Sequence, residues 1–347
     1  MALACRHLGR TGIKVSPLTL GTMMFGTQTD EVTARRIVDR ACEQGINFID
    51  TANSYNGGKS EEVVGRLIGA RRLDWVLATK FSNANPGLGG ANNEGGSRLN
   101  AIRSVEGSLK RLGTDWIDLL YLHREDHETP IEETVRAMGE LIRAGKIRSW
   151  GLSNHRGWKL AEFSRVADAL GVDRPAASQP LYHLANRQIE VEHLPAAHHF
   201  GIGIVPYSPL ARGVLTAKYV PGEKPAADSR AGRRDKRILQ TELRPESLDL
   251  AQRVKAHAEA RGLSAGQFAL GWVLNNRLVT SAIAGPRTFE QWEDYVPALA
   301  YTFTAEDEAF VDELVVPGHA STPGYNDPGH LFYGRQPWNL PAREFGA

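Results

Sequence analysis

The sequence predicts a closed (β/α)8 barrel with long loops after its third and seventh strands and a C-terminal extension. Short β-branched or apolar runs alternate with amphipathic stretches of about 10 to 16 residues, as in repeated β-α units. Eight such units follow one another without an intervening linker. We expect the parallel sheet to close because closure removes both of its exposed edges.

The expected strands have apolar interiors and are bounded by polar or turn-forming residues. In chain order they span residues 18–23, 47–51, 75–80, 117–123, 147–154, 176–179, 203–208 and 281–285. Expected helices span residues 31–44, 97–112 and 131–144, and a glycine follows each of them. Asp30 can cap the first of these helices, and Pro130 can open the third.

Three segments are longer than a minimal barrel requires. Residues 82–97 are rich in Gly and Asn, residues 219–240 are basic, and the tail from residue 317 is rich in Pro, Gly and aromatic residues. Long loops in compact domains are often functional, so the first two segments either border a ligand or are plain connections. Residues 1–347 are expected to form one domain, with 317–347 as a surface extension of it.

Charge and composition exclude several classes of function. The 347 residues carry 41 Lys and Arg against 40 Asp and Glu, so no bulk field favours nucleic acid or an anionic membrane. No signal peptide or membrane-spanning run is recognisable, and a cytoplasmic protein is expected. Cys5 and Cys42 are too few for a disulfide framework or a thiolate metal site, and we expect both to be inert. The oligomeric state stays open, with a homo-oligomer among the possibilities.

Most strand candidates end on a polar or charged residue. The ends are Met23, Asp50, Lys80, His123, Asn154, Gln179, Ser208 and Gly285. In a (β/α)8 barrel these ends meet at the rim that carries catalytic groups. Each residue alone has an ordinary structural explanation, but their combination on one rim, with Tyr55 in the loop after the second strand, favours an active site.

Asp50, Tyr55, Lys80 and His123 form a plausible proton-donating set. A tyrosine hydroxyl titrates near 10, and a nearby lysine ammonium is expected to lower that pKa. Asp50 would keep the ammonium of Lys80 in place, and His123 would orient a carbonyl oxygen beside the phenol. This set suits protonation of an oxygen while a hydride reaches the adjacent carbon.

Other motifs do not indicate a metal site or a nucleotide phosphate loop. His193, His198 and His199 lack a matching carboxylate or cysteine set, so we expect them on a solvated helix face rather than at a metal. The segment NSYNGGKS resembles a nucleotide phosphate loop but has Asn53 where that loop needs its first glycine. No GxGxxG motif opens a helix, and GIGIVP breaks at Pro206. A nicotinamide cofactor would therefore not use a Rossmann site.

The sequence resembles the aldo-keto reductases from about residue 8 to residue 314. The motifs that carry the resemblance are LGRTGIKVSPLTLGTM, FIDTANSYNGGKSEEVVGRLI, LATK, SLKRLGTDWIDLLYLHR, GKIRSWGLSN, SQPLYHLANR and PYSPLARGVLTAKY. Their order, and the SPLARGVLTAKY segment in particular, look most like the bacterial and potassium-channel β-subunit branch of that family.

The resemblance implies a (β/α)8 barrel that binds NADPH or NADP⁺ across its rim and has Asp50, Tyr55, Lys80 and His123 as catalytic residues. It also implies that Ser153, Asn154 and Gln179 hold the nicotinamide amide while Tyr207 stacks on the ring. The remaining implied cofactor contacts are Gly21, Thr22, Met23, Asp50, Ser208, Pro209, Leu210, Arg212, Gly213, Lys218, Arg230, Gly285, Arg287, Gln291 and Asp294.

Two positions bear on the adenosine end of such a cofactor. The family usually has Asn where this chain has Tyr295, so a stacked or displaced adenine is possible there. Arg287 is placed where a cation could meet a 2′-phosphate, which predicts NADPH over NADH, with a structural salt bridge as the alternative.

The expected activity is NADPH-dependent reduction of an aldehyde or ketone. Tyr55, His123 and Phe25 are expected to contact the substrate, with Trp158 and Tyr182 as further candidates. An alternative is an NADPH-binding regulatory or partner subunit that reacts slowly or not at all. A third possibility, an unrelated barrel enzyme for phosphorylated substrates, lacks a glycine-rich phosphate loop after the last two strands.

Overall fold

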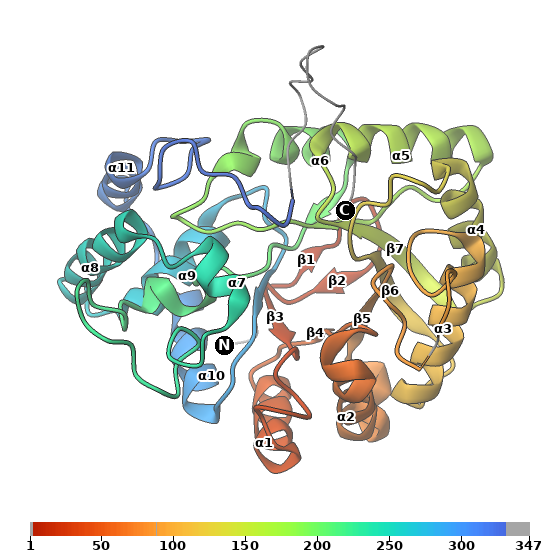
Figure 1. Cartoon of the computed structure of the whole chain (residues 1–347), viewed down its shortest axis with the longest axis horizontal. Helices are drawn as coiled ribbons and strands as arrows, with labels where there is room; N and C mark the ends of the chain where they lie inside the picture. Colours follow the sequence, from red (N-terminus) through yellow and green to blue (C-terminus); the bar gives the residue numbers. More distant parts are fainter. Residues whose placement is uncertain (1–2, 88, 331–347) are drawn as a thin grey trace.

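The computed structural model describes residues 3–87 and 89–330 (Figure 1). At its centre is an eight-stranded parallel sheet in the order β10-β3-β4-β5-β6-β7-β8-β9. The strands are β3 (Leu18–Gly21), β4 (Phe48–Asp50), β5 (Val76–Phe81), β6 (Ile117–Leu122), β7 (Ile147–Ser153), β8 (Ala177–Gln179), β9 (Gly203–Ile204) and β10 (Ala282–Ala284). Neighbours in the sheet are also neighbours in chain order, except that the last strand, β10, pairs with the first, β3.

Backbone hydrogen bonds join the two ends of this sheet. Thr280 N donates to Ile204 O at 2.8 Å, and Ile283 N donates to Pro206 O at 2.9 Å. The strands therefore form the predicted (β/α)8 barrel. β9 is shorter than the predicted strand over 203–208, because Pro206 has no N–H to continue the ladder.

Helices follow the strands and cover the outside of the barrel (Figure 1). They are α1 (Glu31–Glu43), α2 (Lys59–Ile68), α3 (Arg98–Leu112), α4 (Ile131–Arg143), α5 (Gly157–Leu170), α6 (His193–Phe200), α7 (Lys236–Thr241), α8 (Pro245–Glu259), α9 (Ala265–Asn275), α10 (Phe289–Tyr295) and α11 (Ala305–Leu314). The three predicted helices are present as α1, α3 and α4. Asp30 caps α1 by accepting from Thr33 N at 2.8 Å, and Gly113 ends α3 with a φ of 62°.

A two-stranded antiparallel hairpin that was not predicted closes the N-terminal end of the barrel. It consists of β1 (Arg6–His7) and β2 (Lys14–Val15). Leu8 and Val15 are fully buried and belong to the cluster that fills the barrel interior. Gly9 has a φ of 56°, and a Cβ at this position would lie 2.5 Å from a carbonyl oxygen of the barrel. The hairpin therefore fits tightly against the bottom of the sheet.

The histidines of α6 do not share one environment. His198 and His199 are exposed, as predicted, but His193 is buried, with its Nε2 3.0 Å from Ser178 Oγ. The prediction of a solvated position is therefore wrong for His193. His193, the first residue of α6, points toward β8 instead of outward.

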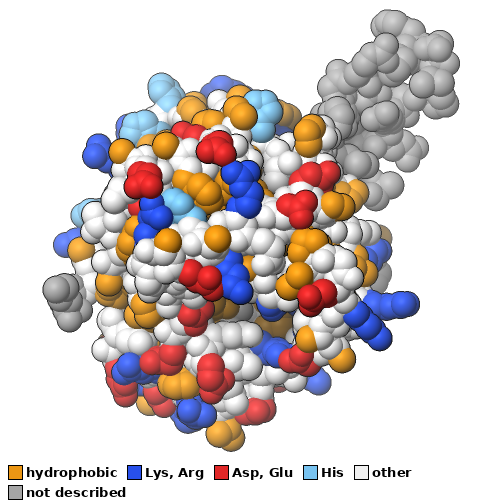
Figure 2. Space-filling model, turned by 90° about the vertical axis from the view of Figure 1, so that its left-hand side faces the viewer, with side chains coloured by type: hydrophobic (Ala, Val, Ile, Leu, Met, Phe, Trp, Pro, Cys, Tyr) orange, Lys and Arg blue, Asp and Glu red, His pale blue; other side chains and the backbone are white. Residues whose placement is uncertain are grey.

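Charged side chains of both signs are interspersed on the face formed by α8, α10 and α11 (Figure 2). This distribution agrees with the formal net charge of +1. Within residues 3–87 and 89–330, no helix combines the length and the apolar character that crossing a bilayer requires. The expectations for residues 331–347 of the tail lie outside the described residues.

Candidate active site

The C-terminal ends of the strands surround a cavity of about 600 Å³. Seven of the eight predicted strand ends line this cavity: Met23, Asp50, His123, Asn154, Gln179, Ser208 and Gly285. The eighth, Lys80, is fully buried and reaches the site from behind Asp50 and Tyr55. The polar rim expected from the sequence is therefore one continuous site.

Lys80, on β5, has its ammonium at the centre of a buried network. Its Nζ donates to Asp50 Oδ1 at 2.5 Å, to the Thr51 carbonyl at 2.7 Å and to Tyr55 Oη at 3.2 Å. Gln179 Nε2 donates to the other carboxylate oxygen of Asp50 at 2.9 Å. Because each charged atom has a partner in a dry environment, the network holds these side chains in one arrangement.

A tight turn positions Tyr55 over the ammonium. Tyr55 begins the 3-10 helix η1 (Tyr55–Gly58), in which Asn56 and Gly57 have φ values of 53° and 65°. Asn56 Nδ2 donates to the carbonyl of Met23 at 2.9 Å, which ties the turn to the loop after β3. The left-handed residues after Tyr55 turn the chain into α2 and leave the phenol at the cavity.

Burial has a larger effect than Lys80 on the pKa of Tyr55. Burial raises this pKa and the charge of Lys80 lowers it, and the net pKa lies above the usual value. The prediction that the phenol is more acidic than usual is therefore wrong, although the predicted effect of Lys80 has the right sign. Burial lowers the pKa of Lys80, but Asp50 and Tyr55 outweigh it and raise the net pKa. A protonated phenol thus lies beside a charged ammonium at neutral pH.

His123 follows β6 and faces the phenol ring. The ring centroids of His123 and Tyr55 are 5.7 Å apart, with an edge-on angle of 77°. Burial, and after it the charge of Lys80, holds the pKa of His123 well below its usual value. The imidazole is therefore neutral, with one N–H to donate and one nitrogen that accepts.

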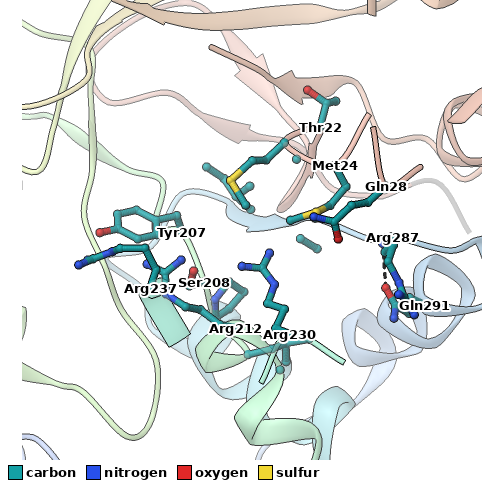
Figure 3. A pocket seen from close by; sticks show the side chains of 18 of the residues that line it. Thr22, Met24, Gln28, Tyr207, Ser208, Arg212, Arg230, Arg237, Arg287 and Gln291 are labelled. Carbon is teal, nitrogen blue, oxygen red and sulfur yellow. Dashed lines mark hydrogen bonds between the residues drawn. The ribbon is translucent and has the colours of Figure 1, made fainter. Parts of the chain in front are cut away.

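All of the residues with a predicted cofactor contact line the same cavity. They are Gly21, Thr22, Met23, Asp50, Ser153, Asn154, Gln179, Tyr207, Ser208, Pro209, Leu210, Arg212, Gly213, Lys218, Arg230, Gly285, Arg287, Gln291 and Asp294. Tyr295 lines it as well. Figure 3 shows Tyr207 and Arg212 on one side of the cavity and Arg287 with Gln291 on the other.

The turn after β9 contains strained residues and an arginine, Arg212, with one unpaired nitrogen in the described part of the chain. Ser208 and Arg212 have φ values of 55° and 54°, which are unusual for residues other than glycine. Arg212 lies in the 3-10 helix η4 (Ala211–Thr216), and its Nε is buried without a hydrogen-bond partner among the described residues. Backbone strain and orphaned polar atoms both concentrate at ligand sites.

Two contacts from the basic loop 219–240 reach across the cavity. Asp228 Oδ2 accepts from Arg287 Nη2 at 2.9 Å, and Arg233 Nη2 donates to Gln28 Oε1 at 2.8 Å. Arg287 follows β10, and Gln28 lies in the loop after β3. In this structure Arg287 therefore makes the salt bridge that was the alternative to a phosphate contact.

Three residues proposed for substrate contact lie elsewhere. Phe25 is fully buried in the hydrophobic core and does not line the cavity, so its predicted role is wrong in this structure. Tyr182 is also buried, and its hydroxyl donates to Glu190 Oε1 at 2.6 Å. Trp158 is half exposed at the start of α5.

Some cavity residues were not predicted. Met24 and Gln28 come from the loop after β3, Arg233 and Arg237 from the basic loop and α7, and His330 from the tail. The composition of residues 219–240 indicated a cationic loop but not which arginines point inward. No sequence pattern predicted His330 at this position. The tail is held beside the cavity by a long-range contact, the ion pair of Arg237 with Asp327 at 2.6 Å.

The arrangement can protonate an oxygen atom that gains negative charge. A protonated phenol and a neutral imidazole face one cavity, and a buried ammonium supports the phenol. Such preorganised donors stabilise developing charge without reorganising. The fold and the site together define a (β/α)8 barrel protein with proton-donating side chains at its rim.

Comparison with known proteins identifies the family. Residues 17–316 match the aldo/keto reductase family, so the chain belongs to that family. An uncharacterized oxidoreductase of Bacillus subtilis, YrpG, is 38% identical over 327 residues, which cover 91% of this chain and 97% of the relative. A protein of Arabidopsis thaliana described as a "probable voltage-gated potassium channel subunit beta" is 37% identical over 299 residues, which cover 85% of this chain and 90% of that protein.

Proposed function

We propose that this protein is an NADPH-dependent reductase of aldehydes or ketones in which Tyr55 supplies the proton. The observation that carries the proposal is the contact of Tyr55 Oη with Lys80 Nζ at 3.2 Å, at the edge of a cavity that His123 also lines. The oxidoreductase among the relatives supports the same reaction class.

The cavity fits a phosphorylated dinucleotide. Arg212, Lys218, Arg230 and Arg287 supply cationic groups along it, and the buried Nε of Arg212 lacks a partner in the described part of the chain. Asn154 and Gln179 supply amides to the cavity that Tyr55 also lines, and a nicotinamide carboxamide would lie against them. A reduced nicotinamide bound there would supply the hydride.

The chain's own residues would bind and protonate the carbonyl oxygen of the substrate. His123 and Tyr55 would donate hydrogen bonds to the carbonyl oxygen and so favour attack at carbon. As negative charge develops, Tyr55 would give up its proton, and the adjacent ammonium of Lys80 would stabilise the phenolate that remains. Asp50 would keep Lys80 charged throughout, since Asp50 Oδ1 lies 2.5 Å from Lys80 Nζ.

Replacing Tyr55→Phe tests the assignment of the proton donor. General acid catalysis contributes roughly 10²- to 10⁴-fold, so kcat should fall by about that factor. Fluorescence titration should give a nearly unchanged Kd for NADPH, because the phenol oxygen is the atom removed. Lost NADPH binding with residual turnover would contradict the role given to Tyr55.

A second candidate function is a regulatory or partner subunit that binds NADPH and turns over slowly. The observation that favours it is the similarity to relatives described as potassium channel β-subunits in Arabidopsis thaliana and, at 34% identity, in Schizosaccharomyces pombe. Steady-state oxidation of NADPH across a panel of aldehydes, ketones and keto-sugars separates the two functions. Turnover of at least one substrate at ordinary enzymatic rates favours the reductase, and tight NADPH binding without turnover favours the subunit.

A further inference from the structure

Protein contacts fix His123 at its backbone and at one ring nitrogen. The backbone N–H of His123 donates to Phe81 O at 2.8 Å, and its carbonyl accepts from Asn154 Nδ2 at 2.8 Å. The ring Nδ1 lies 3.0 Å from Asn83 Nδ2. Among the described residues, none forms a hydrogen bond with the other ring nitrogen, Nε2. The ring therefore keeps Nε2 available at the cavity that His123 lines.

The contact with Asn83 determines which ring nitrogen carries the proton. With the Asn83 amide oriented as in this structure, Nδ2 toward the ring, Nδ1 of His123 is the acceptor, because an amide nitrogen donates hydrogen bonds and does not accept them. The imidazole is neutral in this buried position, so its single proton lies on Nε2. In the other tautomer, Nδ1–H would face the N–H of Asn83, and Nε2 could only accept.

We propose that Asn83 is a positioning residue that fixes the Nε2-protonated tautomer of His123. His123 thereby becomes a hydrogen-bond donor to the carbonyl oxygen of the substrate. The inference rests on the proposed reductase function for its catalytic consequence, whereas the tautomer itself is a property of the protein alone.

The first residues of the loop 82–97 hold Asn83 against the imidazole ring of His123. Ser82 is fully buried and has a φ of 91°, a strained value for a residue with a Cβ. Its Oγ accepts from the backbone N–H groups of His123 at 3.2 Å and Arg124 at 3.1 Å. This anchor compensates for the strain and places the next residue, Asn83, against Nδ1.

The first test reads the tautomer directly. Protein labelled with ¹⁵N-histidine gives separate NMR shifts for protonated and unprotonated ring nitrogens, and the His123 signals are assigned by their loss in His123→Asn. The cofactor-free wild-type protein should show a protonated Nε2 and an unprotonated Nδ1. A protonated Nδ1 in the wild type would overturn the proposal.

Asn83→Asp should reverse the hydrogen bond. A carboxylate only accepts, so it favours a proton on Nδ1 and raises the pKa of His123. The NMR signals should therefore change to the Nδ1-protonated form near neutral pH and to the doubly protonated form as the pH falls. The other titratable groups around the ring are Tyr55, Lys80, Arg124 and His330, and all of them stay in place in this variant.

Kinetics of the same variant separate positioning from a purely structural role. Loss of one oxyanion donor costs roughly 100-fold in kcat, so Asn83→Asp should fall by about that factor at neutral pH. Its kcat should recover as the pH falls, because the imidazolium donates from both nitrogens, while the Kd for NADPH stays constant. A loss that is equal at every pH would contradict the proposal.

A matched substitution in the same loop controls for charge and folding. Asn92→Asp adds the same charge at an exposed position of the loop 82–97 and should leave the tautomer, kcat and the thermal unfolding temperature unchanged. Asn83→Ala removes the hydrogen bond without adding charge and should give a mixture of tautomers and a smaller loss of kcat. If the wild type reduces no carbonyl at all, the reductase function fails, and the NMR result still decides the role of Asn83.

Discussion

At the scale of single residues, Arg287 connects the basic loop to the proposed cofactor site. Its guanidinium is paired with Asp228, whose side chain is 73% exposed. An exposed ion pair of this kind contributes little to stability, so a phosphate could replace Asp228 as the partner. The pairing therefore competes with the proposed contact to a 2′-phosphate.

Arg287→Ala should weaken binding of NADPH and leave binding of NADH almost unchanged. A charge-assisted hydrogen bond contributes about 1.5 to 3 kcal/mol, which corresponds to a roughly 10- to 100-fold rise in the Kd for NADPH. Asp228→Asn removes the competing ion pair but keeps Arg287, so it should not weaken NADPH binding. If the ratio of NADPH to NADH affinity is the same in Arg287→Ala as in the wild type, Arg287 has only a structural role.

The convergence of the proposed catalytic residues could be predicted from the sequence because strand ends meet at one rim. Asp50 ends β4, Lys80 is the second-to-last residue of β5 and His123 follows β6, so their convergence depends only on the barrel topology. The pKa of Tyr55 was less accessible, because its direction depends on how deeply the phenol is buried. Phe25 was misplaced for a related reason: an aromatic residue near a rim can face the core as easily as the cavity.

At the scale of helices and strands, the close packing of α2 against α3 depends on Gly65. A Cβ at this position would lie 2.3 Å from the carbonyl oxygen of Leu112 and 2.8 Å from its Cα. Both atoms belong to the backbone and cannot move aside cheaply. The glycine therefore lets the C-terminal end of α3 approach the middle of α2.

Gly65→Ala should destabilise the protein although it improves helix propensity. Propensity alone favours alanine by about 1 kcal/mol, whereas overpacking costs roughly 1 to 3 kcal/mol or more. Urea denaturation should show a net loss of free energy of unfolding. Gly69→Ala is the matched control, because nothing lies within 4 Å of its Cβ position, and it should be neutral or slightly stabilising. Equal effects of the two substitutions would show that the contact with α3 is unimportant.

The elements that were predicted well are those with a sustained pattern. α1, α3 and α4 show apolar spacing and a glycine stop, and β6 and β7 are long buried runs. The hairpin of β1 and β2 was missed because two-residue strands are too short for periodicity to show. The predicted length of β9 was wrong because the apolar run continues through Pro206, whereas the strand ends before this proline.

At the scale of the whole molecule, buried histidines make the free energy of unfolding depend on pH. His155 is buried, and this burial lowers its pKa to about 3. His193 is buried nearby with a pKa of about 4 for the same reason. In the unfolded chain both histidines titrate near 6.5, so below that pH the unfolded state binds more protons than the folded state.

The free energy of unfolding should therefore fall as the pH drops from about 6.5 toward 3. His155 alone should contribute a slope of up to about 1.4 kcal/mol per pH unit. Urea denaturation at pH 7 and pH 5 should show a smaller difference for His155→Asn, whose amide can replace the Nδ1 contact with Ser153 O at 2.8 Å. His198→Asn, at an exposed position, should keep the wild-type difference. An unchanged difference in His155→Asn would show that this histidine does not cause the acid sensitivity.

The assembly of distant segments was the hardest feature to predict. His330 and Asp327 come from the tail, yet His330 lines the cavity and Asp327 pairs with Arg237, which also lines it. Such contacts depend on the path of an irregular chain, which no periodicity or capping residue specifies. The class of fold and the proposed catalytic set followed from the sequence, whereas the contribution of the tail to the cavity did not.

In the proposed reaction, the hairpin beneath the barrel would also limit the route by which a proton returns to Tyr55. Leu8 and Val15 of the hairpin are fully buried in the cluster that fills the barrel interior, at the end opposite the cavity, and they close the floor of the described part of the barrel. In the proposed reaction, a proton that replaces the one released by Tyr55 would then enter from the mouth of the cavity. Tyr55 would thus be reprotonated only after the alcohol product has left through the mouth of the cavity. Product release would therefore precede each new reaction cycle.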